Sequence, residues 1–425
     1  MKKFAIIGFG GAGCSAAKEI RRLDKTAEIH IYSDTDIGPY NPMLTTYYVK
    51  GAIPYEGMFP FGPLEKLVDE LGLQVHCQLP VTGIDPEEKK LTFSDGSSDV
   101  FDEILISTGA SAIMPPVPGI SLPGVFKMRT AQDAVDFKNV LDEGKAKSCL
   151  VIGASWVGIK VVEDVVLREM DCTLVDGAPW MFFTAAFEGT SKRAQKDLEA
   201  KGVSVSCGQM LTAIEQNEDG SLTATMKSGD RFTADLIAMC VGVRTNTAFV
   251  RESGIEMNRG ILVNSRMQTN CAGIYAAGDC CEAIDTQSGK PRNIGVWLNA
   301  VQQGRVAGAN MAGGDAEFDA NVLLNLAHYL DYDFISIGDI SGCAPEDPVY
   351  EYEDENYYIK VVTKEGRIQC LNVINSADSN GLLKNIFIKA LKNPQAALDT
   401  LTICQLKAKG FPDRFIELLG GKSID

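Results

Sequence analysis

Two short glycine patterns have the residue types and the spacing of phosphate-binding turns. In the first, Gly8-x-Gly10-x-x-Gly13, the glycines follow the apolar run FAII and precede a run of helix-forming residues. The first glycine permits a tight turn, the second lets the backbone approach a phosphate, and the third lets the helix pack on the strand. The N–H groups and dipole at the start of the helix favour an anion. We therefore predict a pyrophosphate-binding turn at this position, with Ala12 inside it.

The second pattern, Gly153-x-Ser155-x-x-Gly158, has a small serine at the middle position and encloses Val157. The next predicted strand ends at Asp176, where a carboxylate can accept hydrogen bonds from both ribose hydroxyls. A 2′-phosphate would be repelled there, so NAD(H) is favoured over its phosphorylated form. The alternative for Asp176 is a solvated carboxylate at a strand end.

The strand after the first turn, EIHIYSD, ends with Ser33 and Asp34, and either side chain could bind a ribose. Two dinucleotide-binding turns in one chain imply two dinucleotides. The simplest pair is an FAD that stays bound and an NAD(H) that binds and leaves, with hydride passing between them.

Composition narrows the class of protein. A chain of 425 residues with 45% hydrophobic and 23% charged residues predicts two or three folded domains. The net charge of −16 disfavours nucleic acid and anionic membrane surfaces as partners. No apolar run reaches the roughly 18 residues of a membrane span, so we expect no membrane insertion. The 12 cysteines include no C-x-x-C pair and there are 3 histidines, which predicts no metal site and a cytoplasmic, reducing location.

Two more segments give the chain a family resemblance. DEILISTGASAIMPPVPG contains Thr108 and Gly109, and GIYAAGDCCEA contains Gly278 and Asp279. With the two glycine turns, in this order, they resemble the FAD-dependent pyridine nucleotide-disulfide oxidoreductase superfamily over roughly residues 1 to 320. The segment NIGVWLNAVQQGRVAGANMAGG resembles the rubredoxin and ferredoxin reductase branch. The whole chain also resembles NADH-side flavoprotein subunits such as that of phenylglyoxylate dehydrogenase.

The resemblance implies an α/β fold with two Rossmann-like domains and a smaller α+β domain. The FAD domain would comprise residues 1–114 and 244–320, with the NAD domain, 115–243, inserted in it. Residues 321–425 would form a C-terminal domain that contributes to a homodimer and to the acceptor side. Within it, YYIKVVTKEGRIQCLNVIN alternates apolar and polar residues around Lys-Glu-Gly, which predicts a β-hairpin.

The same resemblance implies cofactor contacts. Asp279 would bind the ribityl chain, although a helix N-cap is the alternative for an aspartate in a Gly-Asp turn. Thr108 and Gly109 would lie against the FAD, Val81 would meet the adenine through its backbone, and Trp297 would pack beside the flavin. The remaining expected contacts are Asn41, Pro42, Gly242 and Gly278.

One departure from the family concerns the catalytic group. Relatives with a redox cysteine carry N-C-x-L-P-Y-Y, whereas this chain has Pro42 at the cysteine position. The rubredoxin reductase branch has Ser-Lys where this chain has Thr45 and Thr46. Relatives carry glutamate at the position of Lys160, two residues after the third glycine of the second turn. We therefore expect Lys160 to supply a positive charge near the flavin, with Thr45 or Thr46 as hydrogen-bond partners. The alternative is a surface lysine.

The expected activity is transfer of hydride between NAD(H) and FAD, with electrons passed to a separate acceptor without a redox-active cysteine. The acceptor would be a redox protein, a small molecule or a partner subunit. The alternatives are a flavin reductase or oxidase acting directly on oxygen, nitrite, an organic compound or a thiol compound, and a flavoprotein scaffold in a multisubunit complex.

Overall fold

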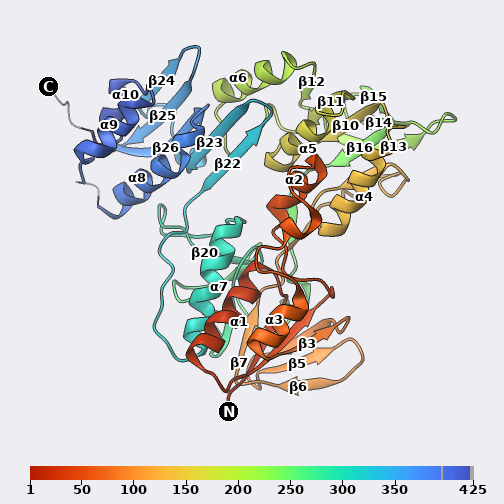
Figure 1. Cartoon of the computed structure of the whole chain (residues 1–425), viewed down its shortest axis with the longest axis vertical. Helices are drawn as coiled ribbons and strands as arrows, with labels where there is room; N and C mark the ends of the chain where they lie inside the picture. Colours follow the sequence, from red (N-terminus) through yellow and green to blue (C-terminus); the bar gives the residue numbers. More distant parts are fainter. Residues whose placement is uncertain (394–395, 422–425) are drawn as a thin grey trace. The chain divides into compact units, whose positions relative to one another are not determined.

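The structure, a computed structural model, describes residues 1–393 and 396–421 (Figure 1). The chain groups into two compact units. Unit 1 contains Met1–Ile113, Met128–Lys138 and Gly242–Asn321. Unit 2 contains Met114–Lys127, Asn139–Val241 and Val322–Asp425, so it holds most of the predicted NAD domain and the predicted C-terminal domain. Residues 394–395 and 422–425 of that C-terminal domain lie outside the described residues.

Unit 1 is built on a parallel five-stranded sheet. Its strand order is β19 (Ile274–Ala276), β7 (Glu103–Ile106), β1 (Lys3–Ile7), β2 (Glu28–Ser33) and β3 (Leu73–Cys77). The central strands are almost continuous apolar runs, as expected for a parallel sheet covered on both faces. Because the carboxyl ends of parallel strands share one edge, the loops after β1, β2 and β7 meet at that edge.

Two helices of unit 1 pack against each other through small residues. α1 (Gly11–Leu23) follows β1, and α7 (Trp297–Met311) lies beside it (Figure 1). A Cβ atom at Gly304 would overlap the carbonyl oxygen of Ala12, so only glycine allows this approach of the two backbones. The start of α7 is thereby held close to the first glycine turn.

Smaller elements complete unit 1. An antiparallel meander follows β3, and the segment between β2 and β3 carries three short helical elements and α3. The elements are β4 (Val81–Asp85), β5 (Lys90–Phe93), β6 (Ser98–Val100), η1 (Pro42–Leu44), α2 (Thr45–Lys50), η2 (Tyr55–Met58), α3 (Leu64–Leu71), β8 (Ala110–Ala112), β17 (Val243–Thr245), η3 (Ala248–Val250), β18 (Ile261–Leu262), β20 (Cys281–Ile284) and β21 (Pro291–Arg292).

The first part of unit 2 has the same plan as unit 1. A parallel sheet has the order β12 (Ser204–Cys207), β11 (Asp171–Asp176), β10 (Ser148–Ile152), β16 (Leu236–Met239) and β9 (Val125–Lys127). An antiparallel meander accompanies it, formed by β13 (Leu211–Gln216), β14 (Leu222–Met226) and β15 (Arg231–Ala234). The helices are α5 (Trp156–Val166), α6 (Glu188–Glu199) and α4 (Ala131–Asp142), the last divided between the two units.

The second part of unit 2 is an antiparallel sheet with helices. Its order is β22 (Leu324–Tyr329), β23 (Tyr332–Gly338), β26 (Arg367–Ile374), β25 (Tyr358–Lys364) and β24 (Val349–Glu353). The remaining elements are η4 (Ile340–Gly342), η5 (Ala377–Ser379), α8 (Asn380–Lys392), α9 (Thr400–Ala408) and α10 (Asp413–Leu418). The predicted hairpin is confirmed, because β25 and β26 are joined by Glu365 and Gly366, both with positive φ. The expected α/β class with two Rossmann-like sheets and a smaller domain is also confirmed.

None of the helices in the described residues combines the length and the apolar composition that crossing a membrane requires. Among the same residues, no group of three or more His, Cys, Asp and Glu side chains is arranged to hold a metal ion.

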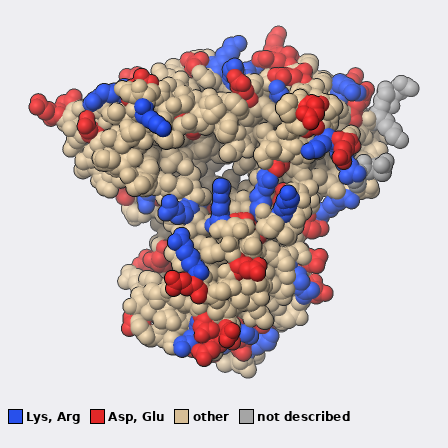
Figure 2. Space-filling view, turned by 180° about the vertical axis from the view of Figure 1, so that it is seen from behind, with Lys and Arg blue, Asp and Glu red and all other residues tan. Residues whose placement is uncertain are grey.

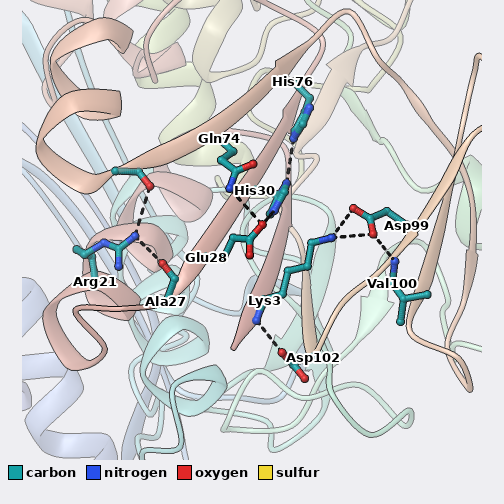
Figure 3. A network of polar contacts seen from close by, with 11 residues as sticks. Lys3, Arg21, Ala27, Glu28, His30, Gln74, His76, Asp99, Val100 and Asp102 are labelled. Carbon is teal, nitrogen blue, oxygen red and sulfur yellow. Dashed lines mark hydrogen bonds and ion pairs between the residues drawn. The ribbon is translucent and has the colours of Figure 1, made fainter. Parts of the chain in front are cut away.

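A histidine pair lies at the edge of the unit 1 sheet (Figure 3). His30 Nδ1 is 3.0 Å from His76 Nε2, and His30 Nε2 is 2.8 Å from a Glu28 carboxylate oxygen. Gln74 Nε2 donates to the same oxygen at 3.1 Å. The two imidazoles share one hydrogen bond, so they cannot both be protonated without losing it. Burial, followed by the nearby His30, lowers the pKa of His76 below its ordinary value of 6.5.

This lowered pKa predicts a loss of stability in weak acid. Below pH 6.5 the unfolded chain binds more protons at His76 than the folded chain does, so the free energy of unfolding falls as the pH decreases through this region. The slope for one proton is at most about 1.4 kcal/mol per pH unit. We expect His76→Gln to flatten this part of the profile, measured by urea unfolding between pH 5 and 8. An unchanged slope in His76→Gln would contradict the assignment.

Candidate functional site

The first glycine turn connects β1 to α1 with no room for side chains at two of its three glycines. Gly8 has φ +92°, and a Cβ atom there would overlap the carbonyl oxygen of Ser107. A Cβ atom at Gly13 would overlap the carbonyl oxygen of Gly8. At Gly10, in contrast, no atom lies within 4 Å of where a Cβ would be. The turn therefore packs tightly on its inner side and is open at Gly10, where a phosphate would approach.

The start of α1 presents backbone donors at this opening. Gly10 is the N-cap residue and makes no side-chain cap hydrogen bond, so the first N–H groups of the helix, which include that of Ala12, have no side-chain acceptor at the cap. Trp297, the first residue of α7, covers Gly11: a Cβ atom there would lie 2.7 Å from the indole ring. Trp297 thus lies beside the turn, with its ring 5.9 Å from that of Phe61.

The residues predicted to bind the ribose lie at the end of β2. Ser33 is the last residue of the strand, and its Oγ accepts a hydrogen bond from the N–H of Thr35 at 3.2 Å. Asp34 is exposed in the loop that follows. Val81, the first residue of β4, is half-buried. The acidic side chain is therefore open to solvent at the carboxyl edge of the sheet, where a ribose hydroxyl could reach it.

The loop after β7 is held by a residue that the sequence did not single out. Thr108 Oγ1 donates to the carbonyl oxygen of Asn246 at 2.6 Å, and Asn246 Nδ2 donates to the carbonyl oxygen of Thr108 at 3.0 Å. Ser111 Oγ donates to Asn246 Oδ1 at 2.9 Å, and the Asn246 N–H donates to the Gly109 carbonyl at 3.0 Å. Gly109 itself has φ +65° and open space where a Cβ would lie. Asn246 thus fixes the backbone beside a second opening.

Arg129 is a second residue that sequence reasoning missed. Its Nη2 lies 2.7 Å from Asp279 Oδ2, and its Nε donates to the Ala110 carbonyl at 2.9 Å. Asp279 follows Gly278, whose φ is +83° and whose N–H donates to Gln303 Oε1. Asp279 is not a side-chain N-cap of α7, which begins after Val296. Arg129 orients the half-buried carboxylate of Asp279. The two residues are 150 positions apart in the sequence, so no local motif indicated that they pair.

The segment predicted to face the flavin is a short helical turn. Asn41 caps η1 by accepting a hydrogen bond from the Met43 N–H at 3.0 Å, and Pro42 is the first residue of η1. Thr45 Oγ1 donates to the Pro42 carbonyl at 2.8 Å, and Thr45 and Thr46 are both buried. Pro42 is therefore compatible with its position, because the N–H of the first residue of a helix has no partner within the helix and proline lacks that N–H.

The second glycine turn repeats the steric pattern of the first. A Cβ atom at Gly153, which has φ +113°, would overlap the Cys240 carbonyl, and a Cβ atom at Gly158 would overlap the Gly153 carbonyl. Ser155 is the N-cap of α5: its Oγ accepts from the Gly158 N–H at 3.3 Å and donates to the Cys240 carbonyl at 3.0 Å. Val157 is 41% exposed, so the start of α5 presents an apolar side chain to solvent. Gly242, with φ +102°, is exposed at the beginning of the return to unit 1.

Asp176 is tied to the same turn. Its Oδ2 accepts from the Ala154 N–H at 2.6 Å, and its Oδ1 accepts from the Ala178 N–H at 2.7 Å. Each carboxylate oxygen retains a further lone-pair position, so the group can still accept ribose hydroxyls. The two amide bonds orient the carboxylate at the end of β11.

Lys160 is buried, which excludes the alternative of a surface lysine. It forms an ion pair with Glu163 one helical turn away, and its Nζ donates to the His328 carbonyl at 2.6 Å. Glu163 Oε1 accepts from the Leu330 N–H at 3.0 Å. The pair therefore connects α5 to the turn between β22 and β23, all within unit 2.

The antiparallel sheet also contacts the start of α5 and the segment at the start of α6. Trp156, the first residue of α5, stacks on Phe334 of β23 with ring centroids 4.9 Å apart. Asn372 of β26 is completely buried, and its Oδ1 accepts from the Phe187 N–H and the Thr190 hydroxyl, each at 3.1 Å. Its Nδ2 donates to the Ala185 carbonyl at 3.0 Å. The start of α5 and the loop before α6 are thus anchored to this sheet.

The adjacent cysteines after Asp279 are two separate buried thiols. Cys280 Sγ donates to the Ile106 carbonyl at 3.3 Å, and Cys281 Sγ donates to the Gly278 carbonyl at 3.3 Å. Burial raises the pKa of Cys280 to about 11 and raises the pKa of Cys281 well above its usual range. Neither sulfur is a thiolate at neutral pH, and a thiolate is the nucleophilic form.

The position of Asp176 predicts its effect on nucleotide binding. Asp176→Ser should weaken NADH binding by about tenfold to a hundredfold, because hydrogen bonds to a charged group contribute roughly 1.5–3 kcal/mol. Isothermal calorimetry with NADH measures this. Asp171→Ser, at the exposed start of the same strand, is the matched control and should bind NADH as the wild type does. Equal affinity in the two variants would remove Asp176 from the nucleotide site.

Comparisons with known proteins agree with this geometry. Residues 2–304 match the family model described as pyridine nucleotide-disulphide oxidoreductase. The chain is 31% identical over 319 residues to an NADH oxidase of Methanocaldococcus jannaschii, covering 74% of this chain and 70% of that protein. It is 27% identical over 396 residues to the epsilon subunit of the NADH-dependent phenylglyoxylate dehydrogenase of Aromatoleum evansii, covering 91% of each.

A solved structure has the same fold. The water-forming NADH oxidase from Lactobacillus brevis bound to NADH superposes with a TM-score of 0.83 at 22% identity, covering 92% of this chain and 91% of that chain. The match over residues 2–304 and the 31% identity to the NADH oxidase show that the chain belongs to the pyridine nucleotide-disulphide oxidoreductase family, as an FAD-dependent NAD(P)H oxidoreductase.

Proposed function

We propose that this protein is an NADH:acceptor oxidoreductase that passes electrons to a separate acceptor without a redox-active cysteine. Bound FAD accepts two electrons as hydride and can release them singly or as a pair. The chain's own residues bind and orient the two nucleotides. We assign the FAD to the turn around Gly10 and the opening beside Gly109, and the NADH to the turn around Ser155 with Asp176 on its ribose.

The observation that carries this proposal is the segment from Asn41 to Lys50. Pro42 begins η1 at the position where relatives with a redox cysteine carry the thiol, and the segment contains no cysteine. The side chain of Met43 is 53% exposed, but a thioether cannot act as a thiolate. Chemistry through a covalent sulfur intermediate is therefore disfavoured here.

The other thiols of unit 1 support the same conclusion. Cys14, Cys280 and Cys281 are buried, and burial raises the pKa of each. Cys77 and Cys271 are half-buried, and burial raises their pKa values as well. Each of these groups is mainly protonated near neutral pH, so none has the lowered pKa of an activated nucleophile.

We propose a partner polypeptide as the electron acceptor. The similarity to the epsilon subunit extends over 91% of both chains, so it includes the antiparallel sheet and not the dinucleotide domains alone. This chain has a net charge of −16, so like-charge repulsion would slow the docking of an acidic electron carrier. On the face shown in Figure 2 the carboxylates form several separate groups, which leaves other surface for a partner. The second candidate is direct reduction of oxygen, favoured by the 31% identity to an NADH oxidase.

Anaerobic titration separates these functions. The proposal requires that NADH bleaches the flavin absorbance with two electrons per flavin and that an added one-electron dye restores it rapidly. Slow return of the absorbance in air is also expected. If air alone restores the absorbance as fast as the dye, the oxidase is the better assignment. If NADH does not bleach the flavin at all, the chain acts as a scaffold.

The proposal that no cysteine takes part in electron transfer can be tested directly. Replacing Cys280 and Cys281 together by alanine should leave the rate of flavin reduction by NADH within about twofold of the wild type, because neither thiol takes part in the reaction. Stopped-flow absorbance measures this rate. Treatment of the wild type with iodoacetamide, which alkylates the exposed Cys404, serves as the accompanying control and should also leave the rate unchanged. A loss of a hundredfold in either experiment would show that a thiol participates.

We propose that Lys160 places a positive charge near the flavin. Its ion pair with Glu163 weakens the electrostatic effect of that charge. Lys160→Met should lower the rate of flavin reduction by about tenfold, equivalent to roughly 1.4 kcal/mol of transition-state stabilisation. It should also destabilise the fold by about 3–5 kcal/mol, because the buried carboxylate of Glu163 loses its counter-charge.

The double variant Lys160→Met/Glu163→Gln separates these two effects. It removes both charges, so thermal unfolding should show that much of the lost stability returns, while the reduction rate stays low. If the rate recovers together with the stability, Lys160 has only a structural role.

A further inference from the structure

Two thiols meet in the antiparallel sheet of unit 2, far along the chain from the dinucleotide motifs. Cys343 Sγ and Cys370 Sγ are 3.3 Å apart. Cys343 directly follows η4, and Cys370 lies in β26 between β23 and β25. Both are free cysteines in this structure. A disulfide would need the sulfurs to approach to about 2.05 Å, which is a small movement for a residue in a loop.

The backbone around the pair explains why the thiols meet. Gly338, the last residue of β23, pairs in register with Cys370. Its φ is +87°, and a Cβ atom there would overlap the Gln369 carbonyl, so the chain can turn back tightly over β26. Asp339 then caps η4 by accepting from the Ser341 N–H at 3.0 Å. Gln369 Nε2 donates to the Asp339 carbonyl at 3.0 Å and holds the returning loop against the strand.

The two thiols differ in access to solvent. Cys343 is half-buried and Cys370 is completely buried. Of the two thiols, Cys343 is therefore the one exposed to a small reagent in solution. Burial raises the pKa of both thiols, so exchange at this pair accelerates as the pH rises.

We propose that Cys343 and Cys370 form a thiol–disulfide exchange site whose substrate is a low-molecular-weight disulfide. The Cys343 thiolate attacks one sulfur of the small disulfide, forms a mixed disulfide and releases one small thiolate. Cys370 Sγ then attacks Cys343 Sγ, its proton passes to the second small thiolate, and that group leaves as a thiol. Two protein thiols are oxidised to one disulfide, and one small disulfide is reduced to two thiols. A dithiol reductant reverses the reaction.

This site is independent of the proposed function. Its two sulfurs and the loop that joins them belong to the antiparallel sheet, and neither step uses a nucleotide. The assignment of NADH, FAD or the acceptor can therefore fail without affecting it, and the reverse is also true.

Peptide mapping tests the proposal on the full chain with its bound cofactors. The protein is reduced with dithiothreitol, desalted, incubated with oxidised glutathione at pH 8, blocked with iodoacetamide and digested with trypsin. Cleavage after lysine and arginine places Cys343 in peptide 306–360 and Cys370 in peptide 368–384. We expect these two peptides to appear linked, with a mass two hydrogens below their sum. Dithiothreitol should abolish the link.

Three variants assign the roles. Cys343→Ser should give no linked peptide and no glutathione on Cys370, because the accessible thiol is gone. Cys370→Ser should retain glutathione on Cys343, because the second thiol is missing. Cys404→Ser, which removes an exposed cysteine elsewhere in unit 2, should give the same link as the wild type.

The wild-type digest decides the matter even if Cys370→Ser does not fold. Glutathione on Cys404 shows that the reagent has acted. If Cys404 carries glutathione while peptides 306–360 and 368–384 remain unlinked, the proposal is overturned. It is also overturned if the wild type retains glutathione on Cys343, or if Cys343 is linked to any other cysteine.

Discussion

The close approach of backbone to backbone at the glycine turns is the constraint on which the rest of the structure depends. At Gly8 and Gly13, and again at Gly153 and Gly158, a single methyl group would overlap a carbonyl oxygen. These contacts fix how each first strand leads into its helix, and therefore where the first N–H groups of the helix lie. The proposed binding of two nucleotides requires this backbone geometry.

The same steric rule operates between helices. Gly304 lets α7 approach α1 so closely that Trp297 covers Gly11 beside the first turn. The sequence contained this information only in part. The strand–turn–helix pattern is local, so the glycine turns could be predicted, whereas the identity of the helix that packs against α1 depends on a residue almost 300 positions later.

The candidate site shows where sequence reasoning reaches its limit. The paired β25 and β26 strands and the end of β11 at Asp176 follow from periodicity and spacing. Asn246 and Arg129 did not, because each acts through partners more than a hundred residues away, Thr108 and Asp279. The pairing of Lys160 with Glu163 spans a single helical turn, but its burial depends on the β22–β23 turn. Burial is a property of the whole unit and cannot be read from a helix in isolation.

The buried amide of Asn372 has a consequence for protein engineering. Its oxygen accepts hydrogen bonds from Phe187 and from Thr190 of α6, and its nitrogen donates to Ala185, so an exchanged sheet would have to reproduce a matching amide as well as a matching shape. Chimeras that combine residues 139–241 of this chain with the antiparallel sheet of another family member should therefore fold poorly. Grafts that transfer residues 139–241 together with 322–421 would keep this junction intact.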